Sequence, residues 1–377
     1  MRVAIASESF LPQTNGVTNS VMRVSEHLRD HGHEALIIAP FDDNVPDSFA
    51  GFPVTTIPAI SWPMFQDVRL GVTPPFVLDR ILADFAPDVL HAAAPFLVGN
   101  AALLSAAHFS IPSVAIYQTD VPSFAAKYGL GVLETAAWSR VRDIHLLANL
   151  TLAPSTYARD QLMEHGVPRV KIWGRGVDTA LFSPDRRDEA LHAKWAPNGE
   201  VVIGFMGRLA PEKQISDLTV LADMPGTRIV IIGDGPSRKA LRRQLPTAVF
   251  LGKLSGAELA RATATMDVFV HPGELETFCQ AIQEALASGV PVVAPAKGGP
   301  IDLVSSGEWG FLYPPGDLDG MRAHVAALVG DPDMRARFSV AARAFTSTRT
   351  WPAICDQLLD YYAEAISMAA GAVPDLR

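Results

Sequence analysis

The sequence predicts an α/β fold of two Rossmann-like, doubly wound parallel-sheet domains that face each other across a cleft. Short apolar segments rich in β-branched residues alternate with helical patterns in the first half of the chain, and a second such series begins near residue 200. A turn-rich, charged segment at 174–190 separates the two series. Continuous apolar strands are typical of a parallel sheet buried on both faces. The separation indicates two sheets and not one long one.

The first series predicts a domain over residues 1–183. Its strands are RVAIAS, EALIIAP, DVLHAA, SVAIYQT and LTLAPS. Between the first two strands, Val21, Val24 and Leu28 recur at helical spacing. Strand, helix, strand is the pattern of a doubly wound sheet.

The second series predicts a domain over residues 184–349. Its strands are VVIGFMG, RIVIIGDG, VFLGKL, DVFVHPG and PVVAPA. Residues 350–370 then form an amphipathic helical pattern with Trp351, Ile354, Leu358 and Tyr362 on one side. Because this helix follows the last predicted strand, we expect it to pack outside the second sheet.

Composition and charge exclude several classes of protein. The 377 residues are 49% hydrophobic and 19% charged, which is typical of a well-packed globular protein. A net charge of −9 argues against a nucleic-acid partner. Cys279 and Cys355 are the only cysteines, so neither a disulfide framework nor a zinc site is indicated, and a reducing cytoplasm is expected. Met1 leads directly into RVAIAS and Glu8, unlike a signal peptide, and no apolar run reaches the length of a membrane span.

Glu276 and Glu284 are the most informative pair of side chains. They lie in HPGELETFCQAIQEALASG, where a loop enters a helix that carries the second carboxylate. Their α-carbons are at most about 12 Å apart, roughly the span from a hexose across a diphosphate to a ribose. The helix N-terminus between them attracts an anion. We interpret the pair as a nucleotide-sugar site; the alternative is two acids on a solvated helix face.

Basic and small residues follow other strands, at the edge where an open parallel sheet binds ligands. Arg208 and Lys213 follow one strand and are predicted to bind phosphate. Gly233, Lys253 and Leu254 follow the next two strands, and the Gly298–Gly299 pair is expected to let backbone approach the donor. In the first half, Asn15 and Gly16 precede a helix. Gly16 is the only glycine of its loop, so the G-x-G-x-x-G dinucleotide motif is absent.

Two D-x-D strings, at 317–319 and 331–333, have the form of a metal-diphosphate motif. Both immediately precede helical patterns, where Asp commonly caps a helix N-terminus. With Arg208, Lys213 and a helix dipole available for the diphosphate, no metal and no other cofactor is expected.

Taken in order, these motifs resemble the retaining GT-B glycosyltransferases of family 4. The resemblance rests on GRLAPEKQ, GDGP, ETFCQAIQEALASGVPVVA, the glycine pair and FLYPPGD, together with NGVTNSV, GHEALIIAP, PDVLH and GVDTALF. It covers nearly the whole chain. ESFLPQTNGVTNSV, YQTDVPSFAAKYG and WGRGVD are similar to the branch that glycosylates lipids, including GDP-mannose-dependent α-mannosyltransferases with glucuronosyl diacylglycerol or phosphatidylinositol-type acceptors.

The resemblance implies roles for individual residues. The first domain would bind the acceptor, the second would bind the donor, and the final helix would pack back onto the first domain. Glu276 would contact the hexose hydroxyls, Glu284 the ribose, and Arg208 and Lys213 the departing diphosphate. Gly16 would close the site. The remaining donor contacts would come from Asn15, Gly233, Lys253, Leu254, Thr277, Phe278, Cys279 and Gln280.

Two positions depart from the family pattern. Gln118 stands where many relatives carry His, and an amide neither takes nor gives a proton in the working pH range. Asp120 is therefore a candidate to assist catalysis. Cys279 replaces a commoner Gly at a position where the backbone is expected to act.

The acceptor is expected on the first domain. Residues 61–71 form a predicted loop with Trp62, Phe65 and Arg69, an apolar and basic set suited to a lipid interface, or else tucked onto the core. Phe124, Lys127 and Tyr128 are further acceptor candidates.

The function expected from the sequence is retaining transfer of mannose from GDP-mannose to a glycolipid at a membrane surface. The protein would be a cytoplasmic monomer that binds peripherally to the inner face of the plasma membrane. Alternatives are a transferase that uses a UDP-sugar or a soluble acceptor, a GT-B-type nucleotide-sugar epimerase, and a non-catalytic sugar-nucleotide sensor. A nicotinamide dehydrogenase is not favoured, because its glycine motif is absent from this sequence.

Overall fold

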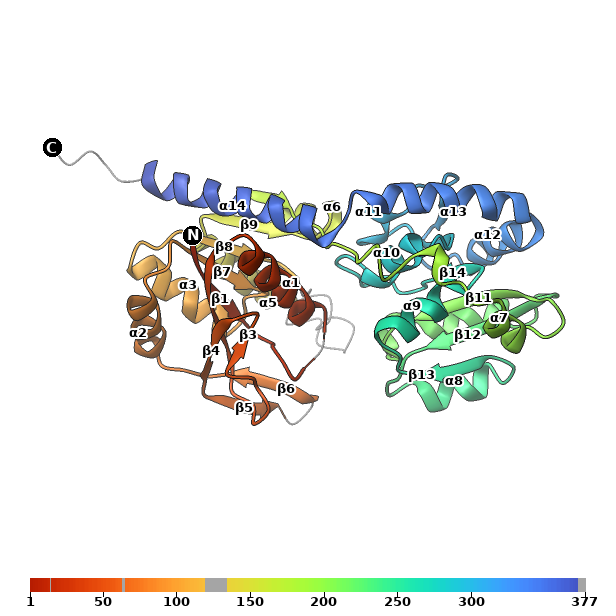
Figure 1. The fold of residues 1–377 in the computed structure, drawn as a ribbon, viewed down its shortest axis with the longest axis horizontal. Helices are drawn as coiled ribbons and strands as arrows, with labels where there is room; N and C mark the ends of the chain where they lie inside the picture. Colours follow the sequence, from red (N-terminus) through yellow and green to blue (C-terminus); the bar gives the residue numbers. More distant parts are fainter. Residues whose placement is uncertain (14, 63–64, 119–133, 372–377) are drawn as a thin grey trace. The chain divides into compact units, whose positions relative to one another are not determined.

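A computed structural model of the chain describes residues 1–13, 15–62, 65–118 and 134–371. The chain divides into two compact units, residues 1–174 with 352–377 and residues 175–351 (Figure 1). Each unit contains its own parallel sheet with helices on both faces. The α/β, doubly wound fold predicted from the sequence is confirmed.

The sheet of the first unit has eight strands in the order β10-β9-β8-β7-β1-β2-β4-β3. Every pairing is parallel except that of β3 with β4. The strands are β1 (Arg2–Ser7), β2 (Glu34–Pro40), β3 (Ser48–Phe49), β4 (Phe52–Ile57), β7 (Val89–Ala93), β8 (Ser113–Ile116), β9 (Leu150–Ala153) and β10 (Val170–Ile172). The five predicted apolar runs correspond to β1, β2, β7, β8 and β9, so continuous apolar character marked the buried strands correctly.

Helices cover this sheet because each has an apolar stripe. They are α1 (Gly16–Asp30), α2 (Pro75–Phe85), α3 (Val98–His108), α5 (Glu134–Leu146), α6 (Thr156–Glu164) and α14 (Trp351–Gly371). The predicted stripe of α1, formed by Val21, Val24 and Leu28, is buried. Residues 61–62 and 65–71, predicted as part of a loop, instead belong to an antiparallel hairpin of β5 (Ala59–Trp62) and β6 (Phe65–Gly71), in which Val68, Arg69 and Leu70 alternate between apolar and polar.

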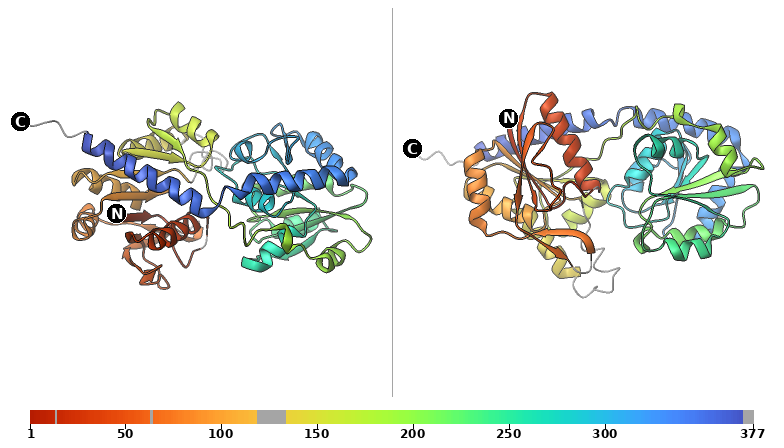
Figure 2. Two further views of the ribbon diagram at one scale, coloured as in Figure 1. Left: turned by 45° about the horizontal axis from the view of Figure 1, so that its top comes forward. Right: turned by 60° about the horizontal axis from the view of Figure 1, so that its bottom comes forward.

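The final helix, α14, packs on the first unit for all but its first residue (Figures 1 and 2). The Tyr362 hydroxyl lies 2.5 Å from His91 Nδ1 in the core, and Trp173 Nε1 donates to the carbonyl oxygen of Ile354 at 2.8 Å. Its buried face consists of Trp351, Cys355, Leu358, Tyr362 and Ala365. Ile354, predicted on this face, is half-buried beside it.

The second unit holds a six-stranded parallel sheet in the order β13-β12-β11-β14-β15-β16. The strands are β11 (Val201–Met206), β12 (Thr227–Ile232), β13 (Val249–Gly252), β14 (Val268–Val270), β15 (Val292–Pro295) and β16 (Gly310–Tyr313). Its α-helices are α7 (Glu189–Trp195), α8 (Arg238–Gln244), α9 (Gly256–Ala264), α10 (Gln280–Ala287), α11 (Pro300–Leu303), α12 (Leu318–Gly330) and α13 (Pro332–Ser347). Its 3₁₀ helices are η2 (Pro184–Arg186), η3 (Pro211–Lys213) and η4 (Ile215–Leu221).

The D-x-D strings cap helices. Asp317 Oδ1 accepts from the backbone N–H of Gly320 at 2.9 Å, at the start of α12. Asp331 Oδ1 does the same for Met334 at 2.8 Å, at the start of α13. The capping interpretation of both strings is therefore confirmed.

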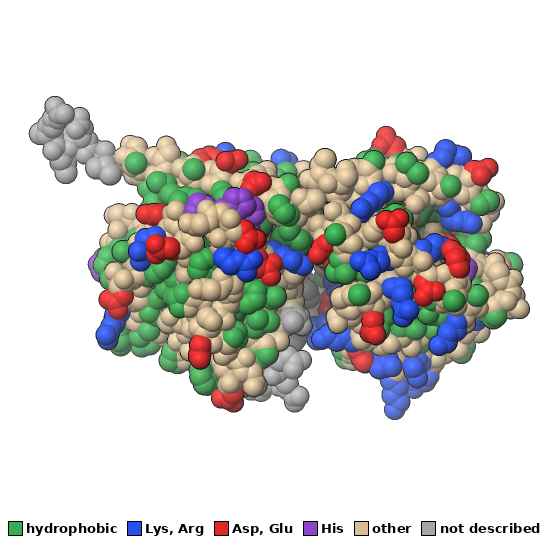
Figure 3. Space-filling model, viewed as in Figure 1, with side chains coloured by type: hydrophobic (Ala, Val, Ile, Leu, Met, Phe, Trp, Pro, Cys, Tyr) green, Lys and Arg blue, Asp and Glu red, His purple; other side chains and the backbone are tan. Residues whose placement is uncertain are grey.

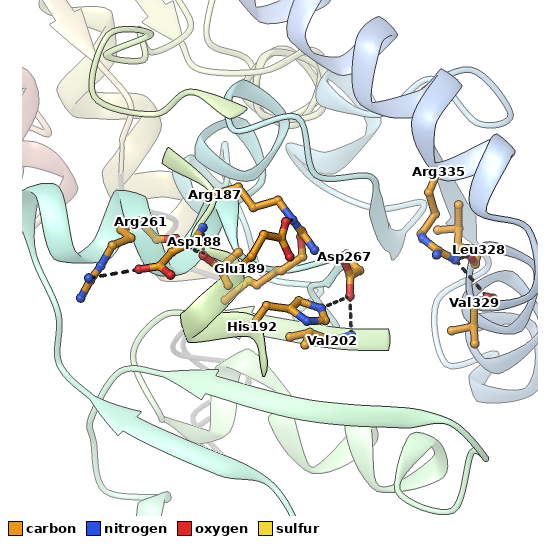
Figure 4. A network of polar contacts seen from close by, with 12 residues as sticks. Arg187, Asp188, Glu189, His192, Val202, Arg261, Asp267, Leu328, Val329 and Arg335 are labelled. Carbon is orange, nitrogen blue, oxygen red and sulfur yellow. Dashed lines mark hydrogen bonds and ion pairs between the residues drawn. The ribbon is translucent and has the colours of Figure 1, made fainter. Parts of the chain in front are cut away.

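The boundary between the units lies after residue 174, earlier than the predicted 183. Residues 175–183 belong to the second unit because α13 and its C-terminal loop hold them: Val177 N donates to Arg349 O at 2.9 Å, and the Arg343 guanidinium donates to the carbonyl oxygens of Thr179 and Phe182. The charged residues that follow are fixed to the same unit (Figure 4). Asp267 accepts from Arg187 at 2.9 Å and binds His192 at 2.8 Å.

Candidate active site

Three polar side chains come together where β11 and β14 end side by side in the second unit. Lys213 follows β11 in η3, His271 directly follows β14, and Glu276 lies in the loop between β14 and α10. Lys213 Nζ lies 2.5 Å from Glu276 Oε1, and His271 Nε2 lies 2.9 Å from the same oxygen. The carboxyl ends of neighbouring parallel strands thus bring together residues that are far apart in sequence.

The Glu276 side chain is only 11% exposed, yet it is ionised. Burial alone would raise its pKa, but the charge of Lys213 and the hydrogen bond from His271 outweigh burial and lower the pKa to about 2. Burial would lower the pKa of Lys213, but the Glu276 charge outweighs it and raises that pKa. The two groups therefore form an ion pair across the neutral pH range.

Arg175 adds a half-buried positive charge to this cluster. Burial lowers its pKa to about 10, while the nearby Glu276 charge and Cys279 oppose that shift, so the guanidinium stays ionised at neutral pH. The Arg175 carbonyl oxygen accepts from Gln283 Nε2 of α10 at 2.9 Å, which holds the backbone of this segment against the helix. Lys213 and Arg175 thus both interact with Glu276, which places two positive charges where an anionic ligand would be attracted.

Arg208, the other cation predicted here, lies on the surface after β11. Its side chain is 62% exposed, and its guanidinium is 4.0 Å from the buried Glu212 carboxylate. The ammonium of Lys213, by contrast, is bound to Glu276. Arg208 is therefore available to a ligand without breaking a short ion pair, whereas Lys213 is already oriented by one.

Glu284 lies on the second turn of α10 in a different electrostatic environment. Burial raises its pKa to about 8, and a hydrogen bond from the Gln280 side chain opposes the shift. Glu276 is thus ionised at neutral pH while Glu284 is largely protonated. The pKa values of two carboxyl groups eight positions apart in the sequence are thus shifted in opposite directions. Such a difference is common where the two groups have different roles.

The loop between the two carboxyl groups has an unusual backbone. Cys279, directly before α10, adopts a left-handed conformation with φ 75°, which is costly for a residue with a side chain. Phe278 and Cys279 are buried, and Thr277 lies between Phe278 and Glu276. The backbone N–H groups at the start of α10 come from Cys279, Gln280 and the residues after them.

Gly298 and Gly299 lie directly against the loop that carries Glu276. A Cβ at either position would collide with the backbone carbonyl of Glu276 or Phe278, and Gly299 N donates to Glu276 O at 2.7 Å. The glycine pair therefore allows close packing against the Glu276 loop and fixes its course. Gly233 is similar, because a Cβ there would collide with the carbonyl oxygen of Gly207.

Other predicted donor residues lie at strand ends with structural contacts of their own. Lys253 is exposed after β13, and Leu254 packs against the core of the second unit. In the first unit, Asn15 Oδ1 caps α1 by accepting from Val17 N and Thr18 N, and Gly16 begins that helix. Gln118 is buried just after β8.

Several predicted positions cannot be assigned contacts. Asp120, Phe124, Lys127 and Tyr128 lie outside the described residues. Trp62, Phe65 and Arg69 are placed by their backbone alone, on the β5–β6 hairpin. In that hairpin Trp62 pairs with Phe65, and Ser61 with Arg69.

Sequence reasoning missed three polar residues at strand ends. His271 follows its strand directly, a position that could have singled it out, and Arg175 lies in the WGRGVD motif. Glu8 directly follows β1, and its carboxylate accepts from the N–H groups of Phe96 and Gly99 at 2.7 and 2.9 Å, at the start of α3. Burial raises the Glu8 pKa, while these backbone hydrogen bonds oppose the rise.

Among the residues whose structure is described, no helix combines the length and the apolar character needed to cross a membrane.

Both halves of the chain match known glycosyltransferase families. Residues 14–181 match Glycosyltransferase Family 4, and residues 187–345 match Glycosyl transferases group 1. The chain is 50% identical over 373 residues to a GDP-mannose-dependent alpha-mannosyltransferase of Mycolicibacterium smegmatis, covering 96% of this chain and 97% of the relative. It is 44% identical over 374 residues to a protein of the same name from Corynebacterium glutamicum, covering 98% and 90%.

Solved structures share the fold at low sequence identity. Sucrose-phosphate synthase from Thermosynechococcus elongatus superposes with a TM-score of 0.78 at 18% identity, covering 97% of this chain and 99% of that one. Anabaena HepE in complex with UDP gives a TM-score of 0.75 at 20% identity, covering 97% and 100%. Two parallel-sheet units, the matched profiles and near full-length relatives together show that this chain is a GT-B glycosyltransferase and belongs to family 4.

Proposed function

We propose that this enzyme transfers mannose from GDP-mannose to a glycolipid acceptor at a membrane surface, with retention of anomeric configuration. The observation that carries the proposal is the Lys213–Glu276 ion pair beside the start of α10, with Arg175 adding positive charge. Relatives at 50% and 44% identity are named for GDP-mannose and mannose transfer, which supports this donor over others.

In the proposed complex, each end of the donor has its own carboxyl group. Glu276, held by Lys213 and His271, accepts hydrogen bonds from the hexose hydroxyls, and Glu284 binds the ribose. The diphosphate lies between them, near the N–H groups at the start of α10 and the cations Arg208 and Lys213. These cations take the place of a metal ion, so we propose that transfer needs none.

Catalysis then rests on stabilising the leaving group. The bond from the anomeric carbon to the phosphate oxygen breaks, the acceptor hydroxyl oxygen forms the new bond on the same face, and its proton passes to the departing phosphate. Negative charge grows on the diphosphate during this step, and preorganised donors are worth most where charge develops. No side chain has to act as the nucleophile in this scheme.

The acceptor is proposed to bind the first unit. The relatives also include sulfoquinovosyl transferase of Arabidopsis thaliana, which is 33% identical over 380 residues. The match covers 97% of this chain and 74% of that protein. We propose that the β5–β6 hairpin, with Phe124, Lys127 and Tyr128, contacts the lipid, and that the enzyme is a cytoplasmic monomer that binds the inner face of the membrane peripherally. Sedimentation with liposomes checks this part: an enzyme that stays in the supernatant at every lipid composition contradicts it.

The function is tested by incubating the protein with GDP-mannose and a bacterial lipid extract, with UDP-glucose as the matched donor. We expect GDP release and a lipid product heavier by one hexose, only when lipid is present. Transfer from UDP-glucose but not from GDP-mannose would show that the donor is a UDP-sugar. Conversion of the donor without lipid would indicate an epimerase, and binding without turnover would indicate a sensor.

A further inference from the structure

A second cluster of ligating side chains lies in the first unit, where α14 packs against α1. His27 and His31 are four residues apart on α1, so they project from the same side of the helix, and Asp356 extends from α14. Asp356 Oδ1 lies 2.9 Å from His27 Nε2 and 3.9 Å from His31 Nε2. Figure 3 shows histidine side chains, in purple, gathered beneath α14. None of these residues belongs to the candidate active site.

The hydrogen bonding of His31 leaves its second nitrogen without a proton in the neutral ring. His31 Nδ1 lies 2.9 Å from the carbonyl oxygen of His27, which can only accept, so Nδ1 carries the ring proton. Nε2 then presents a lone pair toward the Asp356 carboxylate, which also only accepts. Two acceptors that face each other are stable when a cation lies between them. That cation is a metal ion or a second proton on the ring.

His27 supplies a buried ligand atom that is aimed at the same place. The side chain is 7% exposed, and Nε2 lies 2.9 Å from Asp356 Oδ1, the oxygen that also faces His31 Nε2. Imidazole nitrogen binds a metal ion in its neutral form.

The distances suit coordination by a small divalent ion. Metal–ligand bonds of 2.0–2.2 Å in a tetrahedral site place neighbouring ligand atoms about 3.3 Å apart. The observed separations of 2.9 and 3.9 Å lie on either side of that value, and all three ligand atoms lie within 4.8 Å of one another. His31 and Asp356 are 48% and 61% exposed, so their side chains can adjust and water can complete the shell.

We propose that His27, His31 and Asp356 form a binding site for a divalent transition-metal ion, with zinc as the best match. Two imidazole nitrogens and one carboxylate oxygen suit zinc and its neighbours in the first transition row, not magnesium or calcium, which prefer oxygen ligands. The ion bridges α1 and α14 and so fastens the final helix to the first unit. The sequence indicates no zinc site because its two cysteines form no ligand pattern and because these ligands come from two segments more than 300 positions apart.

The site is tested with tag-free protein stripped of metal and titrated with zinc by calorimetry. We expect one strong site in the wild type and at least about a 100-fold loss of affinity in both His31→Ala and Asp356→Asn, since even residues that only orient ligands cost 10- to 100-fold. Both positions are exposed, so the variants should fold; circular dichroism checks this. Cobalt in place of zinc should give visible absorption bands in the wild type that both variants lose.

His108→Ala is the matched control. His108 Nδ1 forms a surface contact with Asp79 at 3.7 Å, and this pair is not part of either three-ligand cluster found among the described residues. The control should bind zinc like the wild type. Wild-type protein that binds no zinc up to millimolar concentration overturns the proposal, as does equal affinity in the wild type, His31→Ala and Asp356→Asn. Zinc that survives both changes would instead occupy His271, Glu276 and Cys279.

Discussion

Lys213 Nζ lies 2.5 Å from Glu276 Oε1, although the two residues are 63 positions apart in the chain. The carboxylate is largely buried, and the same oxygen also lies 2.9 Å from His271 Nε2. The pair orients one carboxylate and one ammonium at the edge of the sheet where ligands of this fold bind. It therefore connects the stability of the second unit with its proposed chemistry.

Removing one partner of this pair should destabilise the protein. Lys213→Met leaves Glu276 charged and buried with His271 and Arg175 as its remaining partners, and we expect a loss on the order of 3 kcal/mol in the free energy of unfolding. The double variant Lys213→Met, Glu276→Gln should recover much of that loss because no unpaired charge remains. Denaturant titration of the three proteins measures both effects. A single variant as stable as the wild type would show that the pair contributes nothing.

Low pH should weaken the same ion pair and so reduce the stability of the protein. The folded-state pKa of Glu276, about 2, is below its ordinary value of 4.5, so the stability from its ionised form is present above pH 4.5 and is lost as the pH falls toward 2. Glu276→Gln should therefore show a shallower loss of stability between pH 4.5 and 2 than the wild type. Thermal melts across this range test the prediction, and parallel pH profiles would contradict it.

Donor binding should depend on pH through Glu284. Its pKa is raised to about 8 in the free protein, and ribose hydroxyls donate more strongly to a carboxylate than to a carboxylic acid. Affinity for GDP-mannose should thus rise from pH 6 toward pH 8.5, with proton release on binding, and then level off. Glu284→Gln should bind more weakly and with little pH dependence. Calorimetry in buffers of different ionisation enthalpy measures the released proton directly.

The stability of the free protein should change in the opposite sense. A carboxyl group with a raised folded-state pKa contributes stability that is full below its ordinary value of 4.5 and is lost as the pH rises through about 8. Relative to Glu284→Gln, the wild type should therefore become less stable as the pH rises between these values. A constant difference in melting temperature over this range would contradict the assignment.

Cys279 offers a test of the loop backbone. At φ 75° a glycine is unstrained, whereas a β-branched residue is strongly disfavoured. We expect Cys279→Gly to keep turnover near the wild-type value, while Cys279→Val loses stability by about 1–3 kcal/mol and loses turnover with it. Denaturant titration with a mannosyl-transfer assay compares the two. Equal behaviour of the two variants would mean that the backbone conformation is not required.

Much of the fold could be predicted from the sequence because buried parallel strands carry a direct signal. The runs RVAIAS and VVIGFM became β1 and β11, and the helical spacing of Val21, Val24 and Leu28 gave the buried stripe of α1. The boundary at 174 was missed because turn-rich composition marks a connection but does not say which unit holds it. Long-range contacts of Val177 and Arg343 decide that question.

The candidate site was predictable only in part. Strand-end position singled out Lys213, and the helix start singled out Glu276, but their pairing needs the neighbouring positions of β11 and β14. Arg175 lies in the WGRGVD motif, but its contact with Glu276 could not be predicted, because its loop precedes the second sheet and reaches the site only through folding. The glycine pair 298–299 shows a further limit: the sequence indicates close approach, while the structure identifies the Glu276 loop as the neighbour.

The central claim is that cations at this site stabilise the departing diphosphate, and Arg208 tests it most directly. Its side chain is 62% exposed and its one ion pair among the described residues is a 4.0 Å contact with Glu212, so Arg208→Ala should change stability little. Arg80→Ala is the control, since the exposed Arg80 also forms a long ion pair, 3.7 Å from Asp84 on α2. The decisive measurement is the single-turnover rate of GDP release from GDP-mannose with lipid acceptor. We predict a fall of about 100- to 1,000-fold for Arg208→Ala and none for Arg80→Ala; equal rates in the wild type and Arg208→Ala would contradict the claim.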